Sequence, residues 1–158
     1  MGSMEDTEES AYKWTPDLSV GIDALDDDHK GFFEMADQLR DAVGRPEPDP
    51  MTVESILLVL DEYVTGHFWR EENALKKGPH LEYVAHKREH DKFKTRYNSI
   101  TTLYYDGRRE AIRELPELVC SWIVEHIRRT DRRYAAWLKA TDVDRRPLAL
   151  LVSAQDMD

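Results

Sequence analysis

The sequence predicts an all-α fold, an antiparallel up-down-up-down four-helix bundle with an extended N-terminal arm and a possible short C-terminal helix. Apolar residues recur at steps of three and four through four long stretches, which is the spacing of one helix face. Short breaks that contain proline or glycine separate most of these stretches. No stretch shows the alternation of apolar and polar residues that is typical of a strand. Amphipathic helices joined by short loops favour a bundle.

The N-terminal region is expected to lie outside the helices. Residues 1–4 (MGSM) are typical of a tag remnant, and the acidic, aperiodic residues after them complete a flexible arm over 1–11. From Trp14 to Ile22 the chain reads WTPDLSVGI, where Pro16 and Gly21 interrupt helical geometry. We therefore expect an extended arm here, lying across the bundle.

The bundle domain is predicted over residues 12–140. Asp23 is the expected N-cap of the first helix. Pro116 either begins the fourth helix or kinks one that starts near Glu110. The hydrophobic periodicity places the four helices at residues 23–43, 52–76, 80–105 and 110–129.

Two further segments follow the fourth helix. Residues 132–140 (RRYAAWLKA) can form a short fifth helix. The tail, residues 141–158, is either a segment packed on the bundle or a linker to a further module.

Composition narrows the class of protein. A length of 158 residues suits one compact domain, and a net charge of −10 argues against nucleic acid or an anionic membrane as the main partner. No run of 18 apolar residues is present, so no membrane span is expected. Cys120 is the only cysteine, which excludes an internal disulfide and favours the cytoplasm.

Histidines occupy the apolar faces of all four predicted helices. A single histidine in such a place is usually a core residue whose hydrogen bonds are satisfied. Each further buried imidazole would need a partner of its own, so several of them indicate a shared site. His80, beside Gly78 and Pro79, is expected to lie away from that site. The five histidines on the apolar faces are His29, His67, His86, His90 and His126.

Two carboxylates accompany these histidines. Glu71 follows His67 by four residues, so both side chains share one helix face. Glu72 points about 100° away from Glu71 and is expected to be solvated or to support a ligand from outside. Asp131 follows His126 by five residues, a spacing that requires the helix to end near Thr130.

Five imidazoles and two carboxylates inside a bundle predict a metal site with enough ligands for two ions. This donor set, which lacks thiolate, suits iron, manganese or zinc, and iron is the first choice for a two-metal site in a helical bundle. The second ring nitrogens of His86 and His90 are expected to meet carboxylates or carbonyls that fix their tautomers.

The order and spacing of these motifs resemble the hemerythrin family, and specifically its bacterial members, over roughly residues 12–135. The arm W-x5-SVGI precedes DDDHK, which is similar to the family's D-x-Q-H-K. HFWREE at 67–72, the HxxxH spacing at 86–90 and WIVEHIRRTD at 122–131 follow in the family's order.

The resemblance implies a role for each ligand. His86, His90 and His126 would hold one non-haem iron, and His29 and His67 the other. Glu71 and Asp131 would bridge the two irons together with an oxo or hydroxo group. The iron with two histidines would keep an open position at which O₂ binds reversibly.

The sequence departs from the family pattern near this position. Ile123 stands where a leucine is usual, Leu75 replaces a methionine, and Asp28 replaces a glutamine before the first histidine. Phe68 and Trp122 match the usual apolar pocket, and Ile123 is expected to complete its wall.

The resemblance leaves several functions open. The main expectation is O₂ carriage, storage or sensing by a protein that also binds small anions such as azide. An alternative is a di-iron enzyme that decomposes peroxide or reduces nitric oxide. A third is the sensory input of a larger signalling protein. The protein is expected to be a monomer or weak oligomer without nucleic-acid or membrane partners.

Overall fold

The computed structural model describes residues 13–78, 80–141 and 143–155, with the side chains of 80 and 153–155 excepted. Within these ranges every regular element is helical. The elements are η1 (Pro16–Leu18), α2 (Asp23–Val43), α3 (Pro50–Leu75), α4 (His80–Tyr105), η2 (Arg109–Glu114), α5 (Leu115–His126), η3 (Ile127–Asp131), α6 (Arg132–Ala140) and α7 (Leu148–Gln155).

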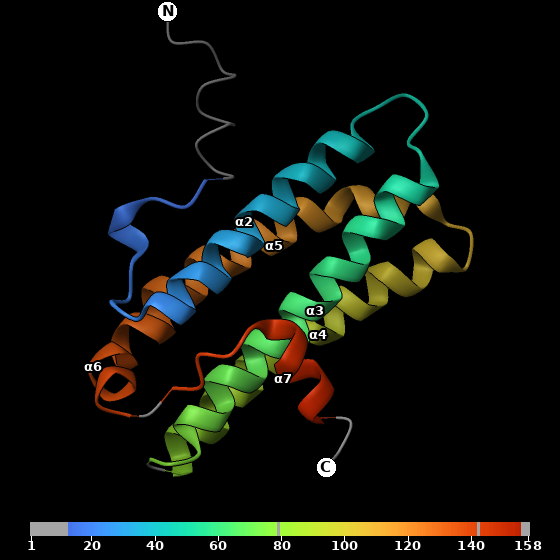
Figure 1. Ribbon diagram of the computed structural model, residues 1–158. Coiled ribbons are helices and arrows are strands. Elements are labelled where there is room, and N and C mark those ends of the chain that lie inside the picture. The colour runs from blue at the N-terminus through green and yellow to red at the C-terminus, as the bar shows by residue number, and fades with distance from the viewer. Residues whose placement is uncertain (1–12, 79, 142, 156–158) are drawn as a thin grey trace, which may run out of the picture.

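The helices α2, α3, α4 and α5 form an antiparallel four-helix bundle (Figure 1). α2 packs against α3 and α5, and α4 packs against the same two helices, so the four surround one core. The predicted fold class is therefore confirmed. Among the described residues no helix is long and apolar enough to span a membrane.

The predicted helix boundaries are close for the first three helices. The first and third match residue by residue, and the second begins two residues early, at Pro50. Proline is favourable there because a first-turn residue needs no N–H donor. Asp49 caps this helix, since its Oδ2 accepts a hydrogen bond from the backbone N of Thr52 at 3.3 Å.

The predicted fourth helix, residues 110–129, is divided into parts of different geometry. A tighter 3₁₀ turn, η2, precedes α5, and Pro116 is the second residue of α5. Pro116 therefore belongs to the first turn, where its missing N–H costs nothing, and does not kink a helix begun at Glu110. The prediction that this helix ends near 129 is wrong, because η3 carries the chain on without a break into α6.

The N-terminal arm packs against the bundle through Leu18, Val20 and Ile22, all of which are buried. It includes one 3₁₀ turn, η1, in an otherwise extended path. The prediction that Asp23 caps α2 is wrong, because Ile22 occupies the N-cap and makes no side-chain hydrogen bond there.

Asp26, one turn into α2, binds the arm instead. Its Oδ1 accepts a hydrogen bond from the backbone N of Val20 at 2.9 Å, and its Oδ2 accepts one from the hydroxyl of Ser19.

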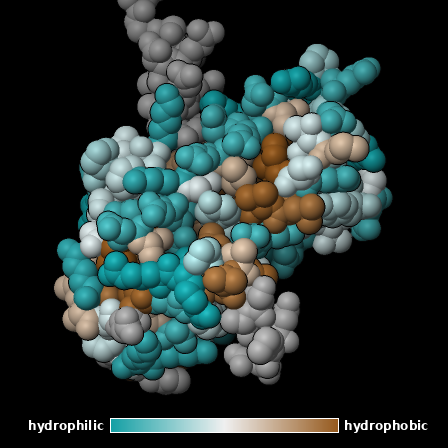
Figure 2. Space-filling view, viewed as in Figure 1, coloured by the Kyte–Doolittle hydropathy of each residue, from teal (hydrophilic) through white to brown (hydrophobic). Residues whose placement is uncertain are grey.

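The C-terminal helix α7 crosses α3 (Figure 1) and packs on it. Val143, Leu148 and Leu151 are buried in this contact region. Figure 2 shows a largely hydrophilic surface that apolar side chains interrupt over α3 and α7. Leu58 and Val59 on α3 and Leu150 on α7 are among the exposed apolar residues.

We predict that Asp26→Ala lowers the free energy of unfolding by about 1–3 kcal/mol, because one buried and one partly buried hydrogen bond to the arm are lost. Urea unfolding measures this change. Asp27→Ala is the matched control, since the side chain of Asp27 is 76% exposed and, among the described residues, pairs only with Lys30, at 4.0 Å. Equal stability of the two variants would contradict the role given to Asp26.

Candidate metal centre

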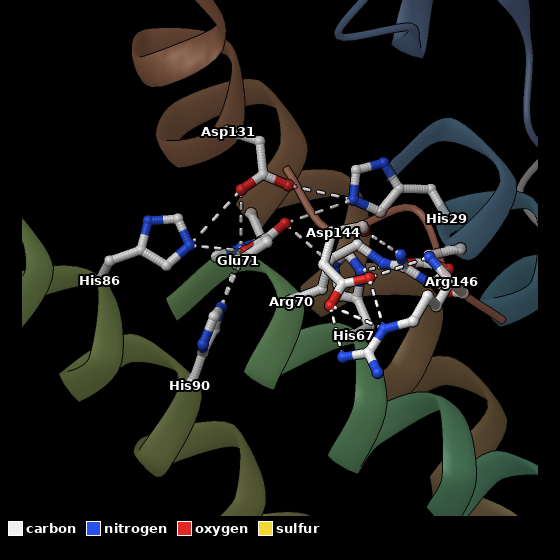
Figure 3. A network of polar contacts seen from close by, with 11 residues as sticks. His29, His67, Arg70, Glu71, His86, His90, Asp131, Asp144 and Arg146 are labelled. Atoms are coloured by element: carbon white, nitrogen blue, oxygen red, sulfur yellow. Dashed lines mark hydrogen bonds and ion pairs between the residues drawn. The ribbon is translucent and has the colours of Figure 1, made fainter. Parts of the chain in front are cut away.

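The seven side chains predicted to bind metal lie together in the bundle core (Figure 3). Every main helix of the bundle contributes at least one, and each residue is at most 4% exposed. The side chain of His80, which was expected to lie apart, is outside the described side chains. The converging residues are His29 on α2, His67 and Glu71 on α3, His86 and His90 on α4, His126 on α5, and Asp131 at the end of η3.

Glu71 lies at the centre of the cluster, with one carboxylate oxygen on each side. Its Oε2 is 2.7 Å from Nε2 of His86 and 3.1 Å from Nε2 of both His90 and His126. Its Oε1 is 2.9 Å from Nε2 of His67 and 3.7 Å from Nε2 of His29.

Asp131 spans the same two groups of histidines. Its Oδ2 is 3.1 Å from Nε2 of His29, while its Oδ1 is 3.0 Å from Nε2 of His126 and 3.6 Å from Nε2 of His86. Figure 3 shows Glu71 and Asp131 between His86 and His29. Each carboxylate therefore offers one oxygen to each group.

The cluster contains two sets of donor atoms, within each of which all atoms lie within 4.8 Å of one another. One set combines His86, His90 and His126, the other combines His29, His67 and Asp131, and Glu71 belongs to both.

Although these atoms lie close together, several of them make no hydrogen bond of suitable geometry within the described residues. They include Nε2 of His29 and His67, Oε1 of Glu71 and both oxygens of Asp131. Buried nitrogen and oxygen atoms without partners are costly, and a pair of metal ions would satisfy them. The donor set therefore fits two metal ions.

A π turn brings Asp131 to the cluster. In a regular α-helix Asp131 would lie about 140° away from His126 around the axis. The helix does not end near Thr130, as the sequence suggested. It widens into the π turn η3, where the backbone N of Arg132 donates to the carbonyl of Ile127. This i→i+5 bond inserts a residue into the turn and returns Asp131 to the face of His126.

The outer nitrogens of the histidines differ in their contacts. Nδ1 of His90 lies 3.4 Å from Oε2 of Glu72, which is only 9% exposed, but this contact lacks the geometry of a hydrogen bond. Nδ1 of His86 has no hydrogen-bond partner among the described residues either, so the expected contact with a carboxylate is present only at His90, as an ion-pair distance. His67 has the shortest such contact, from Nδ1 to Oδ2 of Asp28 at 2.8 Å.

Arg70 is a site neighbour that the sequence did not indicate. Its Nε donates to the same Oδ2 of Asp28 at 2.9 Å, and the residue is 3% exposed. An arginine in an amphipathic helix is normally a surface residue, so nothing in its spacing predicted this burial. The unusual Asp28 was the one available signal.

Aromatic rings surround the histidines. Phe68 stacks on His90 with ring centroids 4.0 Å apart, and Trp122 stacks on His126 at 4.4 Å. Both rings thus lie against the group of three histidines. Ile123, the third expected wall residue, is fully buried.

Two aromatic neighbours were missed. The ring of Phe32 lies 5.4 Å from that of His67, and the ring of Tyr134 lies 6.0 Å from that of His86. Phe32 falls in the first predicted helix and Tyr134 in the possible fifth, and only the packing of the helices brings them to the cluster.

Burial and charge together set the pKa values of the cluster. Burial disfavours charged imidazolium, yet the adjacent Glu71 and Asp28 raise the pKa of His67 to about 10. Burial also disfavours the charged form of His126, but Asp131 and Glu71 raise the pKa of His126 to about 10. For His90, burial outweighs the nearby carboxylates and lowers the pKa.

The pKa values of the two carboxylates are lowered. Burial alone would raise the pKa of Glu71, but His67 and His126 hold it well below its usual range. Burial and Glu71 both act to raise the pKa of Asp131, yet His126 and His29 keep it below its usual value.

The chain is similar to known hemerythrins. Residues 20–138 match the family described as hemerythrin HHE cation binding domain. A bacteriohemerythrin of Clostridium acetobutylicum is 32% identical over 78% of this chain and 98% of its own length. One from Methylococcus capsulatus is 29% identical over 80% and 96%, and a myohemerythrin of Theromyzon tessulatum is 25% identical over 78% and 90%. No solved structure matches significantly.

We predict that the metal-free protein loses stability as pH rises from 6.5 to about 10. The folded-state pKa values of His67 and His126 are raised above the ordinary value of 6.5, so their stabilising contribution is complete below 6.5 and is lost towards 10. Thermal unfolding in the presence of a chelator measures this slope. The double variant His67→Gln/His126→Gln should show a smaller slope, and a rise in wild-type stability over this range would contradict the prediction.

Proposed function

The chain belongs to the hemerythrin family, and from this premise we propose that it binds O₂ reversibly at a non-haem di-iron centre in the bundle core. One observation carries the proposal. Two fully buried carboxylates, Glu71 and Asp131, each direct one oxygen at a group of three histidines and the other at a group of two. That is the donor arrangement of a bridged pair of ions with unequal coordination.

We assign the ligands accordingly. His86, His90 and His126 would hold one iron, and His29 and His67 the other, with Glu71 and Asp131 bridging the two. The second group has one imidazole fewer, which leaves room for an added ligand such as O₂ or azide. The iron pair would supply the electrons by which O₂ is held and then returned.

The surrounding side chains would keep water out. Phe68 and Trp122 cover the imidazoles of His90 and His126, and Phe32 lies against His67. An apolar, closed environment solvates an anion poorly. It would therefore slow the step in which a bound oxygen ligand leaves the site as an anion.

The alternative of an enzyme acting on peroxide or nitric oxide calls for a nearby proton donor. The hydroxyl of the buried Tyr97 donates to Asp61 instead of the cluster. Among the described residues no tyrosine hydroxyl has a hydrogen bond to the seven proposed ligands. We therefore assign no proton donor for turnover. The single buried Cys120 supports a cytoplasmic setting.

Optical spectroscopy tests the proposal. The reduced, iron-loaded protein should gain a visible charge-transfer band in air and lose it again when O₂ is removed. His126→Ala should contain less iron and give a weaker band. A band that decays without recovery, with consumption of peroxide or nitric oxide, would instead identify an enzyme. Full iron content in His126→Ala would contradict the ligand assignment.

We predict that Ile123→Ala speeds autoxidation of the oxygenated protein without changing its iron content. Ile123 is fully buried three residues before His126, so it shares the face of that ligand, and its β-branched side chain is a stiff wall. The decay of the oxygenated spectrum measures the rate.

Leu57→Ala is the control, since Leu57 is equally buried on α3 and both variants lose about 2–5 kcal/mol of stability through a cavity. If the two variants autoxidise at the same rate and bind azide as the wild type does, Ile123 is an ordinary core residue.

A further inference from the structure

A continuous series of polar contacts joins His67 to the C-terminal segment, residues 143–155. Nδ1 of His67 meets Oδ2 of Asp28, and Asp28 accepts a second hydrogen bond from Nε of Arg70. The other two guanidinium nitrogens of Arg70 donate to the backbone carbonyls of Asp144 and Arg146, the latter at 2.9 Å. Figure 3 shows Arg70, Asp144 and Arg146 gathered beside His67 in one network of polar contacts.

Arg70 is a buried cation, and the C-terminal segment supplies two of its acceptors. A buried guanidinium needs acceptors for its donors, since leaving them unpaired is costly. Asp28 accepts a hydrogen bond from Nε at 2.9 Å and a long one from Nη2 at 3.5 Å. The segment's carbonyls accept from Nη1 and, at 2.9 Å, from Nη2. Without the segment the guanidinium would turn to water, and Asp28 would lose a partner that fixes its position.

The turn that presents these carbonyls is itself held in place. The carboxylate of Asp144 accepts hydrogen bonds from the backbone N of Arg146 at 3.0 Å and from its guanidinium at 2.7 Å. The acceptors of Arg70 are therefore on a fixed loop and not on a freely moving tail.

Apolar contacts hold the same segment against α3. Leu151 is fully buried and Val143 is 4% exposed. A methyl group added at Gly66 would lie 3.0 Å from Cδ2 of Leu148 and 3.3 Å from its carbonyl oxygen, so the absent side chain of Gly66 leaves room for Leu148. Gly66 directly precedes His67, which places this contact beside the proposed ligand.

The segment lies beyond the part of the chain that matches the family, which ends at residue 138. The contacts of Asp144 and Arg146 with Arg70 are thus an addition to the matched domain.

We propose that the C-terminal segment positions His67 through Arg70 and Asp28, so that metal binding at His67 and packing of the segment stabilise each other. Asp28 holds the proton on Nδ1 of His67 and leaves Nε2 free to face the ion. This rests on the proposed metal site and not on O₂ binding. Arg70 and Asp28 are positioning residues, since neither belongs to the two donor sets.

The coupling must be reciprocal. The factor by which a bound ion stabilises the packed segment equals the factor by which an unpacked segment weakens ion binding. Occupancy of the site would then change the packing of residues 143–155.

Zn²⁺, a redox-inert ion for these ligands, tests the coupling in the full-length protein. Its affinity is measured by competition with a chelator, and hydrogen exchange of the amides of residues 143–155 is measured with and without it. Zn²⁺ should slow that exchange by about 5- to 150-fold. Leu151→Ser should weaken Zn²⁺ binding by the same factor, whereas Leu150→Ser, on the exposed side of α7 at 52% exposure, should not.

Arg70→Gln tests the link without disturbing the apolar contact. It should weaken Zn²⁺ binding by about 10- to 100-fold and abolish the effect of Zn²⁺ on exchange of the segment. Arg129→Gln is the matched control, because Arg129 is 81% exposed and pairs only with Glu125 in the described contacts. Arg70→Gln also serves if Leu151→Ser fails to fold.

A third measurement needs no metal. In the metal-free protein, the imidazole ¹⁵N signals of His67 should move in Leu151→Ser, while those of His90, which contacts Glu72, should not.

Equal Zn²⁺ affinities of Leu151→Ser and Leu150→Ser, or hydrogen exchange of residues 143–155 that Zn²⁺ leaves unchanged, would overturn the inference. If the wild type binds no Zn²⁺, the proposed metal site fails, and unmoved His67 signals would then overturn the positioning role as well.

Discussion

The placement of Glu71 in the centre of an apolar core constrains everything around it. A buried carboxylate is tolerable only where positive or hydrogen-bonding partners surround it, because the core offers it no water. Four helices meet this need by directing imidazoles at its two oxygens from different sides. The histidines, in turn, are tolerable in the core because two carboxylates face them.

This requirement also shapes the backbone. Both carboxylates must reach both groups of histidines, and Asp131 does so only because the helix after α5 widens by one residue. π turns are rare within helices and occur frequently at functional sites, which agrees with the position of this one beside the cluster.

Around the cluster the protein uses two kinds of outer contact. Aromatic rings lie against histidines of both groups, with Phe68 and Trp122 stacked on His90 and His126 and Phe32 against His67. Carboxylates also contact both groups, with Glu72 beside His90 and Asp28 beside His67. Only the contact of Asp28 continues through Arg70 to the C-terminal turn, among the described contacts.

The sequence by itself determined the first three helices, the bundle and the convergence of the five histidines and Glu71, because periodicities of three and four residues report directly which side chains share a helix face. It also gave the starts and ends of the first three helices to within two residues. The tertiary structure alone decided the π turn, since an i→i+5 bond leaves no mark in composition or periodicity. It alone decided the burial of Arg70 as well. An arginine becomes a core residue only when acceptors from distant parts of the chain meet it, and here those acceptors come from Asp28 on one side and from residues 144 and 146 on the other.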